Sequence, residues 1–392
     1  MANSRPSIIS GWRYSMIRAA MAINIIYLAF LRFRNPFRVV KVMSKLRERA
    51  IENEFVFPRC IRNGNKFHGN LSMQGWPSAA FNRYINYSFD QVVGEDSSLH
   101  LAIFSITHSC GFQCQHCLEW DRLNTLEDLS TDQILTVIRN LHQRGVSQIM
   151  FSGGEPMTRA KDLEEIMARS PEGIEFWTFT NGFTVTPEKA FQLKNSGLTG
   201  MIISIDHPDA EQHDRFRGIA GSHARALKAI EYAQGAGLIA ALSCCATNDF
   251  VSEQNVWKYL EMARNKGVAF IQFLEPKAVG RYSGKRVELS RDKQLILERI
   301  YREINFSPKS VSYPLLTYID YHERTHGCVA HGNNLLYVDA EGYAQNCPFC
   351  RGKKFSLLHE DVARYLLDMK HSACGLFETI VEKSARPKTA DV

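Results

Sequence analysis

Three cysteines in one short loop are the residues of this chain best suited to chemistry. Cys110, Cys114 and Cys117 lie in the stretch THSCGFQCQHC, separated by three and two residues. Thiolates spaced in this way can bind three irons of a 4Fe-4S cluster, and the usual ligand count of four then leaves one iron open to a small chelating molecule. A zinc knuckle or buried free thiols would use the same residue types. The loop therefore predicts a metal site, and an open iron–sulfur cluster is the favoured form.

A second set of cysteines lies towards the C-terminus and consists of Cys328, Cys347, Cys350 and Cys374. Between the first two of them, residues 335–339 alternate in polarity like a strand, residues 340–342 have the composition of a turn, and residues 343–346 begin a return strand. This pattern predicts a β-hairpin. Four thiolates can bind a second iron–sulfur cluster or a zinc ion, because thiolate ligands alone do not distinguish the two.

From residue 100 onwards, apolar strands alternate with amphipathic helices, a pattern typical of a parallel sheet built from βα units. The predicted strands are 101–107, 148–152, 175–180, 201–205, 240–246 and 269–274. The predicted helices are 131–144, 160–168, 187–195, 222–234, 253–266 and 291–304. Six such units predict an α/β fold, a partial (β/α)6 TIM-like barrel, which binds its ligands at the C-terminal ends of the strands.

Glycines and polar residues follow the predicted strands at the end where a barrel binds ligands. The candidates are Gly153, Gly154, Glu155, Asn181, Ser204 and Asp206, with Arg217 further along the chain. Glycines let the backbone approach a ligand closely, and a carboxylate can bind an ammonium group. Each short motif is also typical of a turn or a helix cap, and Arg217 is equally compatible with a surface role. Cys244 and Cys245 are adjacent on one strand, point to opposite faces and are expected to fill the core.

The first cysteine loop, with His116 before its last cysteine, resembles the signature of the radical S-adenosylmethionine (SAM) superfamily. Residues 153–156 (GGEP), 180–182 (TNG), 204–206 (SID) and 213–218 (HDRFRG) resemble further motifs of this superfamily. The resemblance covers about residues 100–375. It implies that Cys110, Cys114 and Cys117 bind a 4Fe-4S cluster whose open iron binds SAM. It also implies SAM contacts from His116, Gly153, Gly154, Glu155, Asn181, Ser204, Asp206, Arg217 and Leu274.

The second cysteine set resembles the SPASM and twitch extensions of that superfamily, in which a β-hairpin carries ligands of an auxiliary 4Fe-4S cluster. A full SPASM domain has seven cysteines, whereas four are available here, so the resemblance implies a single auxiliary cluster. The implied ligands are Cys328, Cys347, Cys350 and Cys374.

Length and composition indicate a folded chain of one large and one smaller domain, since 45% of the 392 residues are hydrophobic and 22% are charged. The expected parts are a basic amphipathic helical extension (1–60), an irregular connection or small β element (61–98), the core barrel (99–306), a small C-terminal hairpin and helix domain for the auxiliary cluster (307–382) and a tail (383–392).

The N-terminal fifty residues carry ten Lys or Arg and the single acid Glu48. The apolar stretch 19–31 has thirteen residues between Arg18 and Arg32, short of the roughly 20 that span a bilayer, so we do not expect it to cross a membrane. A basic amphipathic helix here would lie peripherally on an anionic membrane or pack against the catalytic domain. A nucleic-acid partner is not expected, because no groove-reading module accompanies the basic residues. Clustered cysteines and the lack of a convincing signal peptide favour the cytoplasm.

The resemblance implies an oxidoreductase-like radical SAM enzyme that cleaves SAM to a 5′-deoxyadenosyl radical and abstracts hydrogen from a peptide or a small molecule. Dehydrogenation and cross-linking are the expected outcomes, with electrons from a donor such as flavodoxin or ferredoxin. One alternative is oxidation or rearrangement of a sugar or lipid metabolite at the membrane. An alternative of another class is a zinc-binding protein that contacts membrane or nucleic acid.

Overall fold

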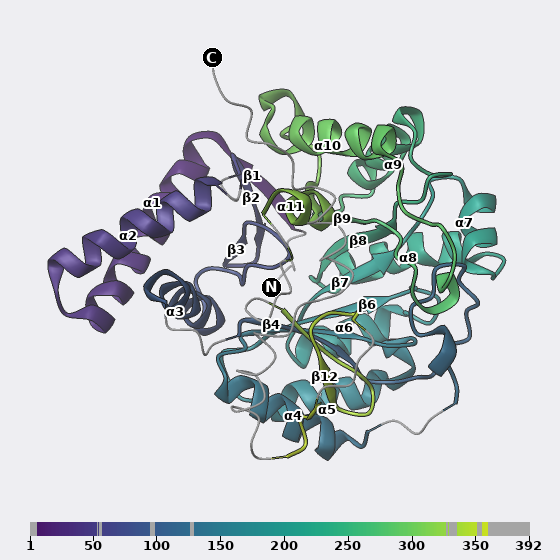
Figure 1. The fold of residues 1–392 in the computed structure, drawn as a ribbon, viewed down its shortest axis with the longest axis horizontal. Coiled ribbons are helices and arrows are strands. Elements are labelled where there is room, and N and C mark those ends of the chain that lie inside the picture. The colour runs from purple at the N-terminus through teal and green to yellow at the C-terminus, as the bar shows by residue number, and fades with distance from the viewer. Residues whose placement is uncertain are drawn as a thin grey trace.

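One large curved sheet forms the centre of the protein in the computed structural model, which describes residues 6–52, 54, 57–94, 99–125, 129–326, 328, 335–350 and 355–359. Its described strands follow the order β10-β9-β8-β7-β6-β5-β4-β11-β12-β13. Every pair from β10 to β11 is parallel, whereas β12 and β13 are antiparallel to their neighbours. The sheet curves into a partial barrel whose two edges, β10 and β13, do not pair with each other (Figure 1).

The predicted α/β class and all six predicted βα units are confirmed. The strands are β4 (Leu101–Ser105), β5 (Gln148–Ser152), β6 (Glu175–Thr180), β7 (Leu198–Ser204), β8 (Ile239–Cys245) and β9 (Phe270–Leu274). The helices between and after them are α4 (Thr131–Gln143), α5 (Ala160–Arg169), α6 (Pro187–Asn195), α8 (Ser222–Gly235), α9 (Glu253–Asn265) and α10 (Arg291–Phe306). A short further helix, α7 (Ala210–Arg217), carries the segment HDRFR.

Two strands that the six-unit pattern did not include extend the parallel sheet at its edges. β10 (Leu315–Tyr318) pairs with β9 and leads into α11 (Ile319–His326). β11 (Leu335–Val338) pairs directly with β4 and begins the predicted hairpin, which continues through β12 (Tyr343–Gln345) and β13 (Phe355–Ser356). The hairpin is therefore confirmed, but it extends the barrel sheet instead of forming a sheet of its own.

Each face of the sheet packs against a separate apolar core, as the alternation of side chains along a strand requires. Residues such as Ala102 and Phe104 pack outwards against the helices. The inward-facing residues include Leu101, Met150, Trp177 and Phe270. Residues Phe57, Ile61 and Leu71 from the N-terminal region pack against them and fill the barrel interior at one end. That end is thereby closed to ligands.

The N-terminal region is more ordered than its sequence indicated. β1 (Ser7–Ser10), β2 (Arg59–Asn63) and β3 (Lys66–His68) form a small antiparallel sheet. Residues 61–98, expected to be an irregular connection or a small β element, also contain α3 (Ala79–Val93), which begins at the side-chain cap of Ser78. α1 (Gly11–Phe33), α2 (Pro36–Glu52) and α3 share their own apolar core around Ala29, Val42 and Phe89.

α1 is longer than the apolar stretch 19–31 suggested, because Arg18 and Arg32 lie within the helix and do not end it. It has 23 residues and contains an 18-residue window with a mean hydropathy of 1.6, which by length and composition alone is enough to cross a membrane. The helix is therefore longer than the thirteen residues on which the sequence-based expectation rested, and that estimate of its length is corrected. Length by itself does not decide whether the helix spans a bilayer, lies on one or packs within the protein.

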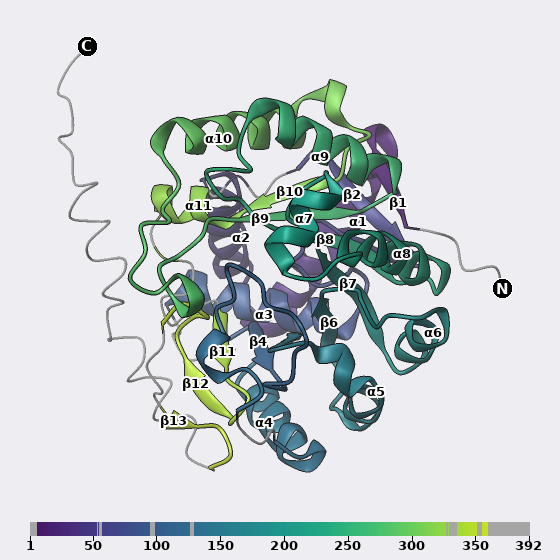
Figure 2. The ribbon, with the colours of Figure 1, turned by 90° about the vertical axis from the view of Figure 1, so that its right-hand side faces the viewer.

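The N-terminal region covers the end of the barrel where the strands begin. The Gln148 side chain, at the start of β5, donates to the Leu71 carbonyl at 2.8 Å. At the start of β6, the Glu175 carboxylate accepts a 2.9 Å hydrogen bond from the Gly75 N–H. Figures 1 and 2 both place α1, α2 and α3 on one side of the barrel, behind the strands when the barrel is viewed along its axis. Any ligand site at the C-terminal strand ends lies on the other side.

Candidate active site

The first cysteine loop follows β4 at the open end of the barrel. Cys114 is buried, whereas Cys110 and Cys117 are half-buried. A cavity of about 470 Å³ lies beside the loop and is lined by Cys110, Phe112, Trp120 and Asn124 among others. Within the described part of the chain, no three His, Cys, Asp or Glu residues lie close enough to hold a single metal ion. A cubane cluster binds each cysteine to a different iron, so its ligands lie further apart than those of one ion.

Burial makes the thiols of Cys110 and Cys117 weaker acids. It raises the pKa of Cys110 to about 11 and that of Cys117 to about 12, and the charge of Cys114 adds to the effect at both. The three sulfurs therefore lie within electrostatic reach of one another. Because metal ligation requires thiolates, binding of a cluster here would release protons from the loop. Three mutually interacting thiols beside a cavity fit a 4Fe-4S cluster.

The two glycines of GGEP pack against the segment that leads into the cysteine loop. The Gly154 N–H donates to the Thr107 carbonyl at 2.8 Å, and the Glu155 N–H donates to the Ser109 carbonyl at 2.8 Å. A Cβ atom on Gly153 would lie 2.4 Å from the Thr107 oxygen, and one on Gly154 would lie 2.4 Å from the Ser109 oxygen. Only glycine fits at these positions, and their contact partner is the backbone that positions Cys110.

Two residues that the sequence analysis did not identify hold the cysteine loop in place. The Asn124 side chain accepts from the Cys110 N–H at 3.0 Å and donates to the Cys110 carbonyl at 2.9 Å. Arg281 donates from its backbone N–H to the Cys117 carbonyl at 3.0 Å and from its guanidinium to the carbonyls of Gln113 and Cys114. The guanidinium also lies 4.1 Å from the centre of the Trp120 ring. Neither residue belongs to a recognisable motif, so spacing alone could not have revealed it.

Glu155 links the ends of β5 and β6. Its buried carboxylate accepts hydrogen bonds from the Thr180 hydroxyl at 2.7 Å, the Asn181 N–H at 2.7 Å and the Met157 N–H at 3.0 Å. Burial raises the pKa of Glu155, although these hydrogen bonds oppose the shift. The structure thus brings together the predicted residues Glu155 and Asn181, with the carboxylate already bonded to protein donors.

A buried ion pair connects the fourth strand end to the cysteine loop. Arg217 Nε lies 2.5 Å from Asp206 Oδ2, and Arg217 Nη1 lies 3.7 Å from Cys114 Sγ. Burial lowers the pKa of Arg217, but the negative charges of Asp206 and Cys114 outweigh burial and raise it overall. Asp206 Oδ1 also accepts from the Cys245 N–H at 2.9 Å. Arg217 is therefore a buried cation beside a cysteine sulfur, and the alternative of a surface arginine is excluded.

His116 is half-buried beside this ion pair. Its ring stacks on Phe216 with the centroids 4.8 Å apart and the planes inclined by 11°. Burial lowers the pKa of His116 to about 4, so the imidazole is neutral at neutral pH. Its Nδ1 atom is buried and has no hydrogen-bond partner within the described protein. A flat apolar face with an unpaired nitrogen suits contact with a heteroaromatic ring such as adenine.

The remaining predicted residues, Ser204 and Leu274, lie at strand ends and have contacts within the sheet. Ser204 is half-buried and pairs in register with Ser243 of β8. The Leu274 carbonyl, a predicted adenine contact, accepts a 2.8 Å hydrogen bond from the Ala246 N–H. That oxygen is thus already used in the sheet, although a carbonyl has a second lone pair. Cys244 is fully buried in the outer core, in agreement with the expected packing role.

The second cysteine set is partly described by the structure. Cys347 and Cys350 have Sγ atoms 3.4 Å apart, joined by a turn in which the Cys350 N–H donates to the Cys347 carbonyl at 3.1 Å. A hydrogen bond with the Cys350 thiol, together with backbone N–H groups and the charge of Lys277, lowers the pKa of Cys347 to about 7. Cys328 is half-buried. Cys374 lies outside the described residues.

The hairpin that carries Cys347 is fixed to the segment just after the first cysteine loop. The Tyr337 hydroxyl donates to Glu119 Oε1 at 2.7 Å, and Arg122 Nη1 lies 3.3 Å from Asp339 Oδ2. Asp339 also accepts from the Tyr343 N–H at 2.9 Å, which shapes the hairpin turn. The two cysteine regions therefore belong to one hydrogen-bonded unit.

Residues 104–265 match the sequence model of the radical SAM superfamily. This segment runs from the last residues of β4 into α9 and contains the cysteine loop, GGEP and the Asp206–Arg217 pair. The chain therefore carries a radical SAM domain over this segment, which covers 162 of its 392 residues.

Among curated proteins, the chain is 32% identical over 163 residues to an AdoMet-dependent heme synthase of Nitratidesulfovibrio vulgaris, covering 41% of this chain and 44% of that protein. It is 30% identical over 181 residues to a GTP 3′,8-cyclase of Xanthomonas axonopodis pv. citri, covering 44% and 54%. It is 32% identical over 166 residues to a PqqA peptide cyclase of Granulibacter bethesdensis, covering 41% and 43%. The chain thus spans about half the length of the curated relatives that it matches.

Solved structures share the fold at low sequence identity. SuiB of Streptococcus suis bound to precursor peptide SuiA superposes with a TM-score of 0.56 at 14% identity, covering 78% of this chain and 72% of that one. Native anSMEcpe with bound AdoMet superposes with a TM-score of 0.51 at 16% identity, covering 70% and 82%. The predicted partial (β/α) barrel is therefore confirmed as the fold.

Proposed function

We propose that this chain binds a 4Fe-4S cluster through Cys110, Cys114 and Cys117 and uses it with SAM to oxidise a substrate by hydrogen abstraction. When bound, the reduced cluster would supply the electron that cleaves SAM into methionine and a 5′-deoxyadenosyl radical, which takes a hydrogen atom from the substrate. The observation that carries this proposal is the three-cysteine loop at the open end of the barrel, fastened to GGEP and to the Asp206–Arg217 pair.

The protein's own residues would bind and orient the reactants. Gly153 and Gly154 hold the cysteine loop close to the second strand end. Arg217 places a fixed positive charge beside Cys114, where it would favour the thiolate form and the added negative charge of a reduced cluster. The neutral ring of His116 would contact the adenine. The remaining predicted SAM contacts, from Asn181, Ser204, Asp206 and Leu274, belong to the same proposal.

The second cysteine set would hold an auxiliary 4Fe-4S cluster through Cys328, Cys347, Cys350 and Cys374. The close sulfurs of Cys347 and Cys350 and the lowered pKa of Cys347 favour metal binding at this pair. Such a cluster could accept an electron from the substrate radical, as a dehydrogenation or cross-linking reaction requires. A structural zinc ion on the same thiolates is the competing assignment.

A peptide is the first candidate substrate. SuiB, with which this chain shares its fold, is described as bound to a precursor peptide, and a relative over the radical SAM segment is named a peptide cyclase. The second candidate is a small metabolite, favoured by relatives named heme synthase and GTP cyclase. A reductant such as flavodoxin or ferredoxin would supply the electron in either case.

Anaerobic iron and sulfide analysis with visible absorption tests the proposal. We expect about eight irons per chain, falling to about four in a variant with Cys110, Cys114 and Cys117 all replaced by Ala, with SAM cleavage under a reductant lost in that variant. A variant with Cys244→Ala is the matched control and should keep its iron and its SAM cleavage. A colourless zinc protein, or undiminished cleavage in the triple variant, would overturn the assignment.

A further inference from the structure

We infer that α1 and the first half of α2 form a surface that docks on an anionic lipid bilayer, with α1 lying flat in the interface. The inference goes beyond the proposed chemistry and does not depend on it. Twelve large apolar side chains are exposed among the described residues, and ten of them lie in α1 and α2, as far as Ile51. Soluble surfaces rarely gather apolar residues in this way without a partner.

α1 is apolar on both of its sides. Its inner side packs Met21, Ile25 and Leu28 into the core shared with α2 and α3. Its outer side exposes residues that recur at intervals of three, four or seven along the helix, namely Trp12 (69% exposed), Met16, Ile23 (69%), Ile26, Tyr27, Phe30 and Leu31. Residues with this spacing form one continuous stripe along a helix. Phe37 (87%) and Val40 (70%) continue the apolar surface on the exposed side of α2.

Positive charge accompanies the apolar stripe. Residues 11–52 hold nine Lys or Arg against the acids Glu48 and Glu52, which gives 9 − 2 = +7, whereas the whole chain carries +6. Arg13, Arg18, Arg34, Arg38 and Lys41 are exposed. Apolar side chains beside exposed cations complement a bilayer with anionic headgroups, because acyl chains accept the first and phosphates attract the second. A second copy of this chain would present the same positive charge, and the two like-charged surfaces would repel each other.

Polar contacts fix the inner side of α1 to the folded body and favour a flat helix over a spanning one. Asn24 Oδ1 accepts a 2.9 Å hydrogen bond from the Trp76 indole. Arg32 pairs with Asp90 of α3 at 2.5 Å and donates to the Asn86 carbonyl. A spanning α1 would leave these partners and place Arg18 and Asn24 in hydrocarbon, which is costly. A flat α1 keeps every one of these contacts.

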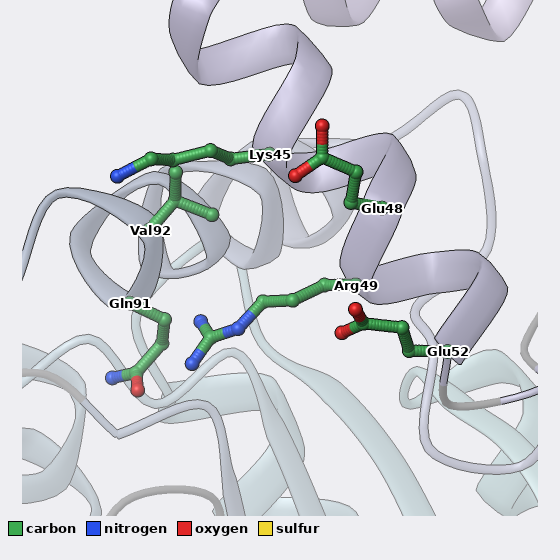
Figure 3. A pocket seen from close by; sticks show the side chains of 6 residues that line it. All are labelled: Lys45, Glu48, Arg49, Glu52, Gln91 and Val92. Carbon is green, nitrogen blue, oxygen red and sulfur yellow. The ribbon is translucent and has the colours of Figure 1, made fainter. Parts of the chain in front are cut away.

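The docking surface does not extend over the second half of α2. There, a groove of about 230 Å³ separates α2 from α3 and is lined by Lys45, Glu48, Arg49, Glu52, Gln91 and Val92. Figure 3 shows Lys45 and Arg49 reaching from α2 towards α3, with Glu48 and Glu52 on the same stretch of helix. Two acids balance the two cations here, so the groove does not contribute to the net attraction. The unbalanced charge lies nearer the α1–α2 corner.

Docking through α1 would leave the active site open to the aqueous side. The N-terminal helices cover the end of the barrel where the strands begin, and the cysteine loop follows the opposite end of β4 (Figures 1 and 2). A substrate would therefore approach from the cytosol-facing side of such a docked enzyme, and the bilayer would act as a place of attachment.

Flotation of the full-length protein with vesicles tests the inference. We expect binding to phosphatidylcholine vesicles that contain phosphatidylglycerol, and much weaker binding to phosphatidylcholine alone or at high salt. Arg34→Gln, Arg38→Gln and Lys41→Gln together should weaken binding about 100-fold, at about fivefold per charge. Trp12→Ser, Ile23→Ser and Phe37→Ser should each weaken it about tenfold. SAM cleavage should remain unchanged in all of these variants.

Matched variants on the barrel serve as controls. Lys161→Gln, Lys228→Gln and Lys258→Gln remove three exposed charges. Phe191→Ser with Leu295→Ser removes the two large exposed apolar side chains that the described residues hold outside the N-terminal helices. Both sets should bind vesicles like the parent protein. Equal losses in the controls, no preference for anionic vesicles, or concentration-dependent dimers that vanish with Phe37→Ser would overturn the inference.

The depth of α1 separates a flat helix from a spanning one. Ile23→Trp places a fluorophore at the middle of the outer stripe. Its emission should be quenched most by lipids brominated near the headgroup. Strongest quenching by lipids brominated at the acyl-chain ends would overturn the flat orientation. Vesicle binding can be measured without iron or SAM, so its failure is distinguishable from a failure of the proposed chemistry.

Discussion

The structure holds the two cysteine regions in place through different kinds of contact. Backbone and side-chain contacts from GGEP, Asn124, Phe216 and Arg281 fix the first loop from several directions. Within the described residues, the contacts of the Cys347–Cys350 pair include its own turn and the hairpin before it, which is fixed to Glu119 and Arg122. A site that must aim a reactive fragment at one carbon needs fixed geometry, whereas an electron carrier or anchor tolerates more freedom. The contrast predicts that the first region controls the SAM reaction.

The largest expected effect separates the two regions by activity. Cys114→Ala should reduce SAM cleavage by far more than the roughly 10- to 100-fold that loss of a supporting residue costs a metal site. Cys347→Ala with Cys350→Ala should lose about four irons and leave SAM cleavage within a few fold of the parent. Cleavage assays with iron analysis give both results. Equal loss of SAM cleavage in the two variants would contradict this difference between the regions, since the second cysteine region would then also be needed for SAM cleavage.

A methyl group at GGEP should disturb the fold around the first loop. Gly154→Ala places a Cβ atom 2.4 Å from the Ser109 backbone oxygen, and relieving this clash should cost about 3 kcal/mol of unfolding free energy and much of the iron content. Gly235→Ala, at the end of α8, meets no atom within 4 Å and should stabilise the protein by about 0.5 kcal/mol. Thermal denaturation measures both. A neutral Gly154→Ala would show that the loop is less tightly fixed than its contacts suggest.

Removing a single support of the loop should have an intermediate effect. Arg281→Gln or Asn124→Ala should lower SAM cleavage about tenfold and change the electron paramagnetic resonance signal of the reduced cluster, because each loses hydrogen bonds to the cysteine backbone. Arg286→Gln, on an exposed residue of the same segment, is the control and should behave like the parent. An unchanged resonance signal would assign Arg281 a purely structural role.

The last expected effect appears only on acidification and is a dependence of stability on pH behind the first loop. The Asp206 N–H donates to His213 Nδ1 at 3.1 Å, and burial lowers the pKa of His213 to about 4 although Asp206 opposes the shift. The unfolded chain takes up this proton near pH 6.5, so stability should fall between pH 6.5 and 4, by up to about 3 kcal/mol. Urea denaturation across this range measures the slope. His213→Asn keeps a hydrogen-bond acceptor but does not titrate in this range, so it should flatten the slope of stability against pH. An unaltered slope would show that another group causes the pH dependence.

Much of this architecture could be predicted from sequence. The period of the βα units located six strands and six helices within a few residues, because strands buried on both faces are continuous apolar runs. Three of the helices between them, α4, α6 and α9, also begin at Ser or Thr caps. The cysteine loop and the polar strand ends were predicted as well, since their residue types are unusual for packing.

The rest depends on contacts between residues distant in sequence. Asn124 and Arg281 have ordinary neighbours, and only the fold places them on the cysteine loop. α3 was missed because its polar and aromatic residues match no clean helical stripe until α1 and α2 cover them. The partnership of Asp206 with Arg217 likewise follows from the meeting of β7 and α7 at one strand end.

The backbone hydrogen bonds between residues 107–109 and 154–155 have an evolutionary consequence. The two motifs that they join lie some forty residues apart in the sequence, yet neither can change its backbone path without moving the other. Natural variation at the two places should therefore be correlated, and an insertion in one should be tolerated only with a compensating change in the other. A chimaera that takes the cysteine loop from one relative and GGEP from another would inherit a mismatched pair, whereas a transplant of both together would carry the cluster site intact.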